Sequence, residues 1–347
     1  MKVLFLYNNF GPKFVREGWG RVFKYCGHEF RFWSPEKEAT FEVFDEFEPD
    51  LVIATTYDLD RALLKNIVKR PNLKVVLFGS AYGPIINDID QKKYPIVTAK
   101  QQEIETISAL FHLVGKPNLI FLHTANKYID YQLSWWGNMG INIDGILNAA
   151  DVFVYINGKK RDNLICDIGF VGGYWGYKSR NLDKYLLTLA GKQQYNIKIF
   201  GNQKWPIPEY LGYIDDDMVN DLFASAKICP NISEPHSTDL GFDCVERVFK
   251  VWSSGGFCIS DRVAELQELI PDFPTYGDYK DFETAIDYWL TYPKQKEELR
   301  RHIQKIIFDK HTYFDRVAQI LQNIDMNQES ELVLKKKEEY FENLNCN

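Results

Sequence analysis

The chain has 347 residues, of which 45% are hydrophobic and 15% aromatic, so it has ample side chains for packed cores and is not a disordered protein. This length suits two domains of ordinary size. The net charge of −7 at pH 7 disfavours broad binding to polyanions, because affinity for duplex nucleic acid comes from lysine and arginine side chains that neutralise phosphates.

The N-terminus and the cysteines bear on where the protein resides. The opening residues MKVLFLYNNFG lack a small-residue cleavage site, which favours a first β-strand over a signal peptide. No apolar run reaches the roughly 18 residues that a membrane-spanning helix needs. Six scattered cysteines, with no CxxC pair, predict reduced thiols. We therefore expect a cytoplasmic protein.

The first half of the chain alternates strand and helix patterns. Buried strands are predicted at Val3–Tyr7, Glu29–Trp33, Leu51–Thr55, Lys74–Phe78, Leu119–His123 and Val152–Ile156. Helices are predicted at Val15–Tyr25, Leu59–Arg70 and Ala99–Val114. Such alternation indicates a doubly wound parallel sheet of the Rossmann type, in which ligands bind beyond the carboxyl ends of the strands.

The second half restarts the pattern after the polar stretch Asn157–Asn163. Strands are predicted at Asp167–Val171, Asn196–Phe200, Ile228–Asn231 and Gly256–Ser260, and helices at Asn181–Ala190, Asp216–Ser225, Cys244–Ser253 and Asp281–Leu290. Two Rossmann-like halves joined near residue 160 would face a cleft between two sets of strand ends, and such a cleft suits a reaction with two substrates.

The remainder of the chain is predicted to be helical. Pro293 suits the start of a new helix, and breaks are expected near Asp309–Thr312 and Asp325–Gln328. The charged, amphipathic tail ELVLKKKEEYFENLN predicts a solvated surface helix, with folding back onto the first domain as the alternative. The predicted domains are an acceptor domain at 1–158, a donor domain at 159–324 and a C-terminal helix at 325–347.

Glycines and cations follow the first strand of the second half. Gly172 and Gly173 lie between this strand and a predicted helix, where backbone N–H groups can approach a phosphate. Lys178 and Arg180 follow in the same segment, and arginine can bind a diphosphate in bidentate fashion. Gly201 ends the next strand. A tight strand-to-helix turn also favours glycine, so the phosphate site and a purely structural turn both remain open.

A third group of candidates lies between Glu234 and Asp261. Glu246, Arg247 and Lys250 share one predicted helix, where cations suit phosphates and a carboxylate suits sugar or ribose hydroxyls. An ion pair between Glu246 and Lys250, four residues apart, is the structural alternative. His236 follows a strand end and is a candidate donor to a phosphate or sugar, against the alternative of a solvated loop histidine.

Three further features have competing explanations. His123, at the end of a first-half strand, is a candidate general base toward an acceptor hydroxyl, and a bond to the local backbone is the alternative. Trp135 and Trp136 suit either stacking on a sugar ring or ordinary packing. The run Asp215–Asp217 is explained by capping and first-turn charge of a helix, so we predict no metal site there.

Taken in order, these segments resemble a known family. DIGFVGGYWGYKSRNLDKYL, KIFG, YLGYIDDDMVNDLFASAKICPNIS, ERVFKVWSSGGFCISD and HTYFDRVAQIL resemble the C-terminal half of GT-B glycosyltransferases of the CgeB-like group, from Asp167 to about Leu321. The order of the glycine loop, strand-FGN and RVFKVWSS is also similar to that of phage DNA β-glucosyltransferases. The first half adds only a compatible Rossmann pattern.

The resemblance implies a nucleotide-sugar site in the second half. Many related enzymes carry a ribose-binding glutamate five residues before a glycine, but here that position, before Gly255, is Lys250, so Glu246 is the candidate substitute. Arg247 matches the arginine that often precedes this position. GT-B enzymes generally need no metal, since protein cations and a helix N-terminus stabilise the leaving diphosphate, so no cofactor is expected.

The sequence therefore predicts a metal-independent glycosyltransferase that takes its sugar from a nucleotide-diphosphate sugar, UDP or GDP, and delivers it to a hydroxyl of a glycan or other acceptor. A hydroxymethylated DNA base is a possible acceptor that the acidic charge balance disfavours. A nucleotide-binding GT-B protein without turnover and a scaffold protein that binds no nucleotide are the two alternatives from other classes.

Overall fold

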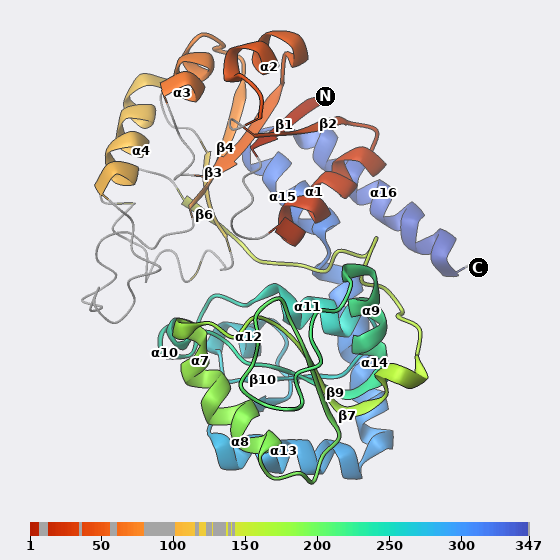
Figure 1. Cartoon of the computed structure of the whole chain (residues 1–347). Coiled ribbons are helices and arrows are strands. Elements are labelled where there is room, and N and C mark those ends of the chain that lie inside the picture. The colour runs from red at the N-terminus through yellow and green to blue at the C-terminus, as the bar shows by residue number, and fades with distance from the viewer. Residues whose placement is uncertain are drawn as a thin grey trace. The chain divides into compact units, whose positions relative to one another are not determined.

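The computed structural model describes residues 1–6, 13–34, 37–55, 61–79, 101–114, 118–122, 127, 137, 140 and 143–345. The chain forms two compact units, one made of Met1–Leu147 with Tyr313–Asn347 and the other of Asn148–Thr312 (Figure 1). Each contains a parallel sheet flanked by helices, as the predicted α/β class requires. Within the described ranges, no helix has both the length and the apolar character needed to cross a membrane.

The first unit is built on a six-stranded sheet in the order β2-β1-β3-β4-β5-β6. Its strands are β1 (Lys2–Leu6), β2 (Glu29–Trp33), β3 (Leu51–Thr55), β4 (Lys74–Gly79), β5 (Asn118–Leu122) and β6 (Ile143–Ile146). All the pairings are parallel. Every residue of β3 is buried, as expected for a strand with both faces covered. β6 was missed by the sequence analysis, because its short IDGI segment contains a polar residue and a glycine.

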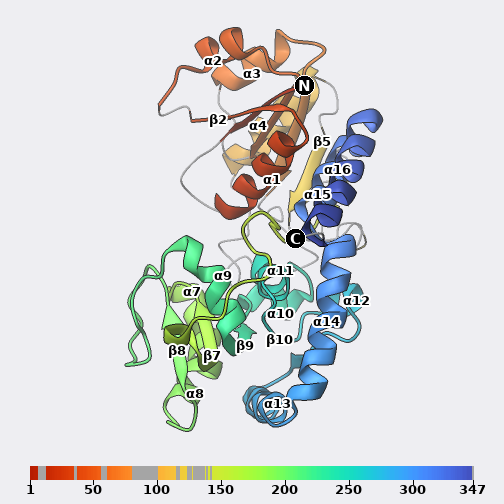
Figure 2. The same ribbon diagram turned by 90° about the vertical axis from the view of Figure 1, so that its right-hand side faces the viewer.

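Helices cover both faces of this sheet (Figure 2). They are α1 (Lys13–Tyr25), α2 (Thr40–Phe47), α3 (Arg61–Val68), α4 (Gln101–Val114), α15 (Tyr313–Asn323) and α16 (Asn327–Asn345). The buried Trp19 of α1 stacks edge-on against Phe78 of β4 at 5.0 Å between ring centroids, and its ring lies 6.4 Å from that of Tyr313 of α15. These contacts attach the C-terminal helices to the first unit.

The C-terminal segment differs from its predicted assignment. Residues 313–324 were predicted within the donor domain, but Arg316 donates from Nε to the Leu147 carbonyl at 3.0 Å, and α15 and α16 belong to the first unit. Val333 of α16 is fully buried, so the tail is not simply a solvated surface helix. The apolar face of α15, with Phe314, Val317 and Leu321 buried, requires a partner surface, and the first unit provides it.

The second unit carries a five-stranded parallel sheet in the order β11-β10-β9-β7-β8. The strands are β7 (Cys166–Val171), β8 (Ile197–Phe200), β9 (Ala226–Asn231), β10 (Cys258–Asp261) and β11 (Thr275–Tyr276). The helices are η3 (Asp162–Leu164), α7 (Gly176–Leu182), η4 (Asp183–Leu187), α8 (Thr188–Ala190), α9 (Asp216–Ser225), α10 (Pro235–Leu240), α11 (Glu246–Ser253), α12 (Ala264–Leu269), α13 (Tyr279–Thr291) and α14 (Pro293–Lys310). α9 and α11 pack on β9, and α13 packs on β9 and β11.

One predicted strand does not form. Residues Val152–Ile156 form a turn, because Asp151 accepts hydrogen bonds from the backbone N–H groups that follow it. Its carboxylate accepts from the N–H of Phe153 at 3.2 Å, and its carbonyl accepts from that of Tyr155 at 2.8 Å. A side chain that bonds its own downstream backbone competes with strand pairing. The apolar residues Val152 and Tyr155 are buried nonetheless, which explains why the pattern resembled a strand.

Candidate functional site

The candidate site lies where the strand order of the second unit reverses. β7 pairs with β8 on one side and with β9 on the other, so the chain switches direction across the sheet between β7 and β9. Ligands of doubly wound sheets bind beyond the carboxyl ends of the strands at such a switch point. In this unit those ends are Val171 of β7 and Asn231 of β9.

Arg247 of α11 spans the two strand ends. Its Nη2 donates to the Val171 carbonyl at 2.7 Å, and its Nη1 reaches Asn231 Oδ1 at 3.5 Å. The guanidinium lies over the ring of Phe170, 4.4 Å from the centroid. Burial lowers the pKa of Arg247 from its ordinary value, and guanidinium groups stay protonated in proteins. A fixed cation therefore stands at the switch point.

The predicted glycines explain how the strand ends approach one another. A Cβ on Gly172 would lie 2.9 Å from Nη2 of Arg247, so a side chain there would displace the guanidinium. A Cβ on Gly201 would overlap the Gly172 carbonyl oxygen and lie 2.9 Å from its carbonyl carbon. A Cβ on Gly173 would lie 3.0 Å from Gln203 Oε1. Close backbone approach accounts for Gly201, whereas the absence of a side chain on Gly172 lets the Arg247 guanidinium pack directly against the backbone.

We predict that Gly201→Ala destabilises the protein by about 1–3 kcal/mol, because the added methyl group overlaps the Gly172 backbone and forces the strand ends apart. Gly176→Ala is the matched control, since a Cβ there meets nothing within 4 Å. Chemical denaturation of both variants measures the difference. Equal stability of the two variants would contradict the close packing of β7 and β8.

Lys178 adds a second cation to this edge. The half-buried residue lies on α7, and its amine makes no hydrogen bond or ion pair with any residue that the structure describes. Burial lowers the pKa of Lys178 to about 7, and the Arg247 guanidinium lowers it as well, whereas the carboxylates of Glu234 and Asp261 raise it. A bound anion would favour the charged form of this amine and raise its pKa. Arg180, by contrast, is exposed near the end of α7.

A buried polar network behind Arg247 was not predicted from the sequence. Asp261, at the end of β10, accepts from the backbone N–H and the hydroxyl of Ser233, both at 2.7 Å. Asn231 donates to Ser233 Oγ at 3.1 Å and to Ser260 Oγ at 2.9 Å. Burial raises the pKa of Asp261. Polar residues at the carboxyl ends of two strands, in the segments NIS and ISD, were the available signal.

Glu246 and Lys250 form the ion pair that the sequence analysis gave as the alternative to a ligand-binding role. Lys250 Nζ lies 2.8 Å from Glu246 Oε2, and both side chains are largely buried. The Lys250 amine also lies 4.6 Å from the ring centroid of Tyr155. The pair occupies the first turns of α11, beside Arg247. Lys250 stands where the family resemblance implies a glutamate, and it is paired with the carboxylate of Glu246 one helical turn earlier.

We predict that Glu246→Ala lowers the stability by about 3 kcal/mol, because it leaves the buried Lys250 ammonium without this carboxylate. Lys250→Met is expected to cost less, since the new side chain keeps its apolar stem against Tyr155. Thermal unfolding of both variants measures the stability, and UDP-sugar titration at a temperature where both are folded separates this effect from a ribose contact. A costlier Lys250→Met would refute the buried-pair explanation.

His236 is buried rather than solvated. Its Nε2 lies 2.8 Å from Asp243 Oδ2, and its Nδ1 lies 3.3 Å from the Tyr177 hydroxyl. The rings of His236 and Tyr177 are stacked at 5.9 Å. The histidine thereby connects α10 to α7, the helix that carries Lys178. This arrangement suits a positioning role, because a contact with phosphate would compete with one of these two partners.

Other candidates are less informative. His123, Trp135 and Trp136 lie outside the described residues. Asp216 and Asp217 occupy the first turn of α9 as predicted, although Asp215 at the N-cap makes no side-chain capping bond. In the described part of the chain, no three histidine, cysteine, aspartate or glutamate side chains are grouped to hold a metal ion. The five described cysteines are buried and free.

A comparison with protein-family models finds a similarity over the second unit. Residues 180–322 match the family model described as glycosyl transferase-like, which covers the second unit from α7 onward and continues into α15. A comparison with curated protein sequences found no match. The second unit is therefore similar to glycosyl transferase-like domains, in agreement with the resemblance seen in the sequence.

Solved structures extend the similarity to the whole chain. The DNA-modifying enzyme β-glucosyltransferase is 14% identical, with a TM-score of 0.52 over 97% of this chain and 99% of that chain. The T4 phage enzyme in complex with UDP and Mn²⁺ is 13% identical, with a TM-score of 0.51 over 97% and 99%. An α-glucosyltransferase in complex with UDP-glucose and DNA is 9% identical, with a TM-score of 0.55 over 88% and 94%. These similarities confirm the GT-B fold.

Proposed function

We propose that the chain transfers a sugar from a UDP-sugar to an acceptor hydroxyl, with the donor diphosphate at the carboxyl ends of β7 and β9. The observation that carries this proposal is Arg247, which bridges Val171 and Asn231 across the switch point. Several similar structures hold UDP or UDP-glucose, which makes UDP the first nucleotide to test.

In this mechanism the chain's cations stabilise the departing diphosphate. Negative charge develops on the phosphate oxygens as the bond between sugar and diphosphate breaks. Arg247 can stabilise this negative charge without reorienting, because Phe170 and the Val171 carbonyl already fix the orientation of its guanidinium. Lys178 supplies a second positive charge once the anion favours its protonated form. Preorganised cations in a partly desolvated site stabilise charge better than mobile surface cations.

The roles of metal and of general base belong to the same proposal. We assign the stabilisation of the leaving group to protein cations without an obligatory metal, although one similar enzyme has been solved with UDP and Mn²⁺.

His123 is the proposed general base toward the acceptor. His123→Ala should then lower kcat more than it lowers donor affinity, which steady-state kinetics and UDP-sugar titration together measure. Full turnover by this variant would remove His123 from the reaction.

The proposal is tested by calorimetric titration with UDP, GDP, ADP and dTDP, with and without EDTA, followed by donor hydrolysis assays with the matching sugar conjugates. Selective binding of UDP that survives EDTA, together with release of UDP from a UDP-sugar, is the expected result. Binding without turnover would favour a nucleotide-binding protein. No nucleotide binding would overturn the proposal and favour a scaffold protein.

A hydroxymethylated base in DNA is a second candidate acceptor. It is favoured by two similar structures, one described as a DNA-modifying enzyme and one solved with DNA. The net charge of −7 argues against it, because repulsion from the phosphate backbone must be overcome locally. Assays with labelled UDP-glucose and duplex DNA that contains or lacks hydroxymethylcytosine decide between this acceptor and a glycan.

A further inference from the structure

A basic cavity lies at the opposite edge of the second unit's sheet from the candidate donor site. Its volume is about 370 Å³, and its lining includes the first residues of β9 and the residues just before β10. Because the strands are parallel, their amino ends lie at the edge away from Val171 and Asn231. β9 has six residues and so spans about 20 Å at roughly 3.3 Å per residue. The donor diphosphate at the other edge does not fill this cavity.

The charges that line the cavity are unbalanced. Its charged side chains are Lys160, Lys227, Lys296, Arg300 and Glu297. Lys227 is paired with Asp167 at 2.8 Å, and Arg300 with Glu297 at 2.8 Å. For Lys160 and Lys296, the described part of the chain provides no carboxylate partner. The cavity lining therefore carries four cationic side chains against the single carboxylate of Glu297, and neither Lys160 nor Lys296 forms an ion pair with a described carboxylate.

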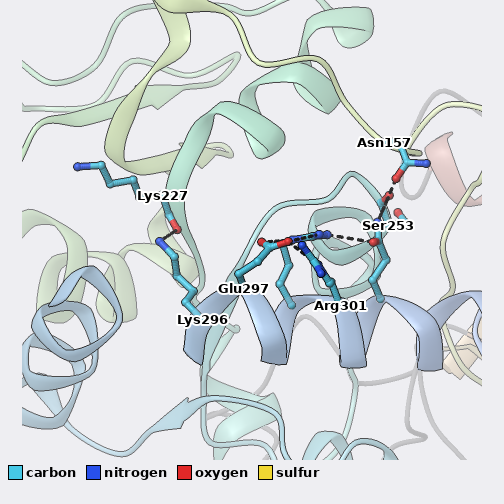
Figure 3. Close-up of polar contacts among 8 residues, drawn as sticks. Asn157, Lys227, Ser253, Lys296, Glu297 and Arg301 are labelled. Carbon is cyan, nitrogen blue, oxygen red and sulfur yellow. Dashed lines mark hydrogen bonds and ion pairs between the residues drawn. The ribbon is translucent and has the colours of Figure 1, made fainter. Parts of the chain in front are cut away.

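Lys296 is held at the cavity by its surroundings. Its Nζ donates to the backbone carbonyl of Lys227 at 3.2 Å, and Figure 3 shows it pointing from α14 toward that residue. Its amine also lies 6.0 Å from the ring centroid of Phe257. Burial lowers the pKa of Lys296, and the positive charges of Lys227 and Lys160 lower it further. An anion would relieve this repulsion.

Arg300 is preorganised on the same helix. Its Nε and Nη2 each donate to the Glu297 carboxylate at 2.8 Å, and its Nη1 donates to Gln304 at 2.9 Å. Gln304 is in turn 3.3 Å from Asn157 Oδ1 and from the Ser253 carbonyl oxygen. The three bonds that Arg300 donates to Glu297 and Gln304 use three of the five N–H groups of its guanidinium. The side chain is thus fixed with donors remaining for a ligand.

The nearby end of α11 does not oppose an anion strongly. C-terminal carbonyl groups of a helix normally repel negative charge. Here the Ser253 carbonyl accepts from the Asn157 N–H at 3.1 Å, and the Ser254 carbonyl accepts from the Gly158 N–H at 2.8 Å. Gly158 and Gly256 allow this close packing, since a Cβ on either would overlap a backbone carbonyl of α9. The carbonyl groups are occupied, and the lysines dominate the local charge.

We propose that this cavity is an anion site that binds a phosphate-bearing ligand, separate from the donor site and independent of the proposed transferase activity. Phosphate suits it because the converging ammonium and guanidinium groups bind phosphate oxygens through charge-assisted hydrogen bonds. The ligand is either a small phosphorylated molecule or a phosphate of a nucleic-acid strand. Both present the same chemistry to Lys160, Lys296 and Arg300.

The test is calorimetric titration of the full chain with inorganic pyrophosphate and, separately, with a single-stranded oligothymidylate at two salt concentrations. Lys296→Ala should weaken binding at least about tenfold, the loss expected for one charge-assisted contact. Lys294→Ala, an exposed lysine two residues away on α14, is the matched control and should change nothing. Arg247→Ala removes any contribution of the donor site to the pyrophosphate isotherm. Thermal unfolding verifies that each variant is folded.

The two probes distinguish the source of the phosphate. Pyrophosphate binding that Lys296→Ala weakens and Arg247→Ala preserves supports a site for a small phosphorylated molecule. Oligothymidylate binding with the same Lys296 dependence, weakened by salt, supports the site with a nucleic-acid strand as its ligand. Binding of neither probe, or binding that Lys296→Ala leaves unchanged, overturns the proposal. Loss of pyrophosphate binding in Arg247→Ala alone would assign that binding to the donor site.

Discussion

Arg247→Ala is expected to weaken UDP binding by about 2 kcal/mol, or roughly 30-fold, because it removes the cation that bridges the two strand ends. The measurement is calorimetric titration with UDP at fixed pH and salt. The loss should exceed that from Arg180→Ala, since Arg180 is exposed on α7 and Arg247 stands at the switch point. This comparison separates the two arginines that the sequence alone could not rank.

Two further variants make the Arg247 result interpretable. Arg247→Lys keeps the positive charge but loses the planar fork, so an intermediate affinity is expected if the guanidinium forms two bonds. Lys294→Ala, on the exposed face of α14, should bind UDP like the unmodified chain. Circular dichroism establishes that Arg247→Ala is folded after it loses its bond to the Val171 carbonyl. Unchanged affinity in a folded Arg247→Ala protein would remove this residue from the site.

UDP affinity is expected to fall as the pH rises above 7, and Lys178 is the cause. Its pKa is about 7 in the free protein, so its amine is mostly neutral above that pH. A bound diphosphate favours the ammonium form and raises this pKa, so binding takes up a proton. The affinity should decline by at most about tenfold per pH unit between the pKa of the free and of the bound protein.

Calorimetry in two buffers of different ionisation enthalpy measures the proton uptake directly. The experiment covers pH 7 to 9, because the terminal phosphate of UDP titrates at about pH 6 and would obscure the proton uptake by Lys178 at lower pH. Lys178→Met should bind more weakly at pH 7 and lose the proton uptake, while its affinity stays nearly constant across this range. Proton uptake that persists in Lys178→Met would assign the titration to another group.

The structure also suggests why a low lysine pKa and a nearby arginine occur together. Arg247 and Lys178 repel each other while the site is empty, and Glu234 and Asp261 compensate only in part. A dianionic ligand relieves the repulsion, so binding energy is gained where the donor's charge is greatest. Tyr177 and His236 fix α7 against α10 and thereby hold Lys178 near Arg247.

The sequence by itself determined the class of the fold and most of its elements. β2 and β3 have their predicted bounds, and α9 and the start of α14 at Pro293 do as well. These segments have strong local signals, namely aromatic or β-branched apolar residues in the strands, an acidic first turn and a helix-starting proline. The order of the glycine loop, the ERVFK segment and the closing ISD strand was enough to indicate a GT-B fold, which the comparisons confirmed.

Only the tertiary structure decided which candidate side chains meet. Sequence spacing suggested that Glu246, Arg247 and Lys250 act together, but Glu246 and Lys250 form a buried pair while Arg247 reaches β7, 76 residues earlier in the chain. The network of Asn231, Ser233 and Asp261, the basic cavity at the amino edge and the return of α15 to the first unit likewise depend on contacts between distant segments. Local patterns encode which face of an element is apolar, whereas strand order and helix packing determine which polar groups share a site.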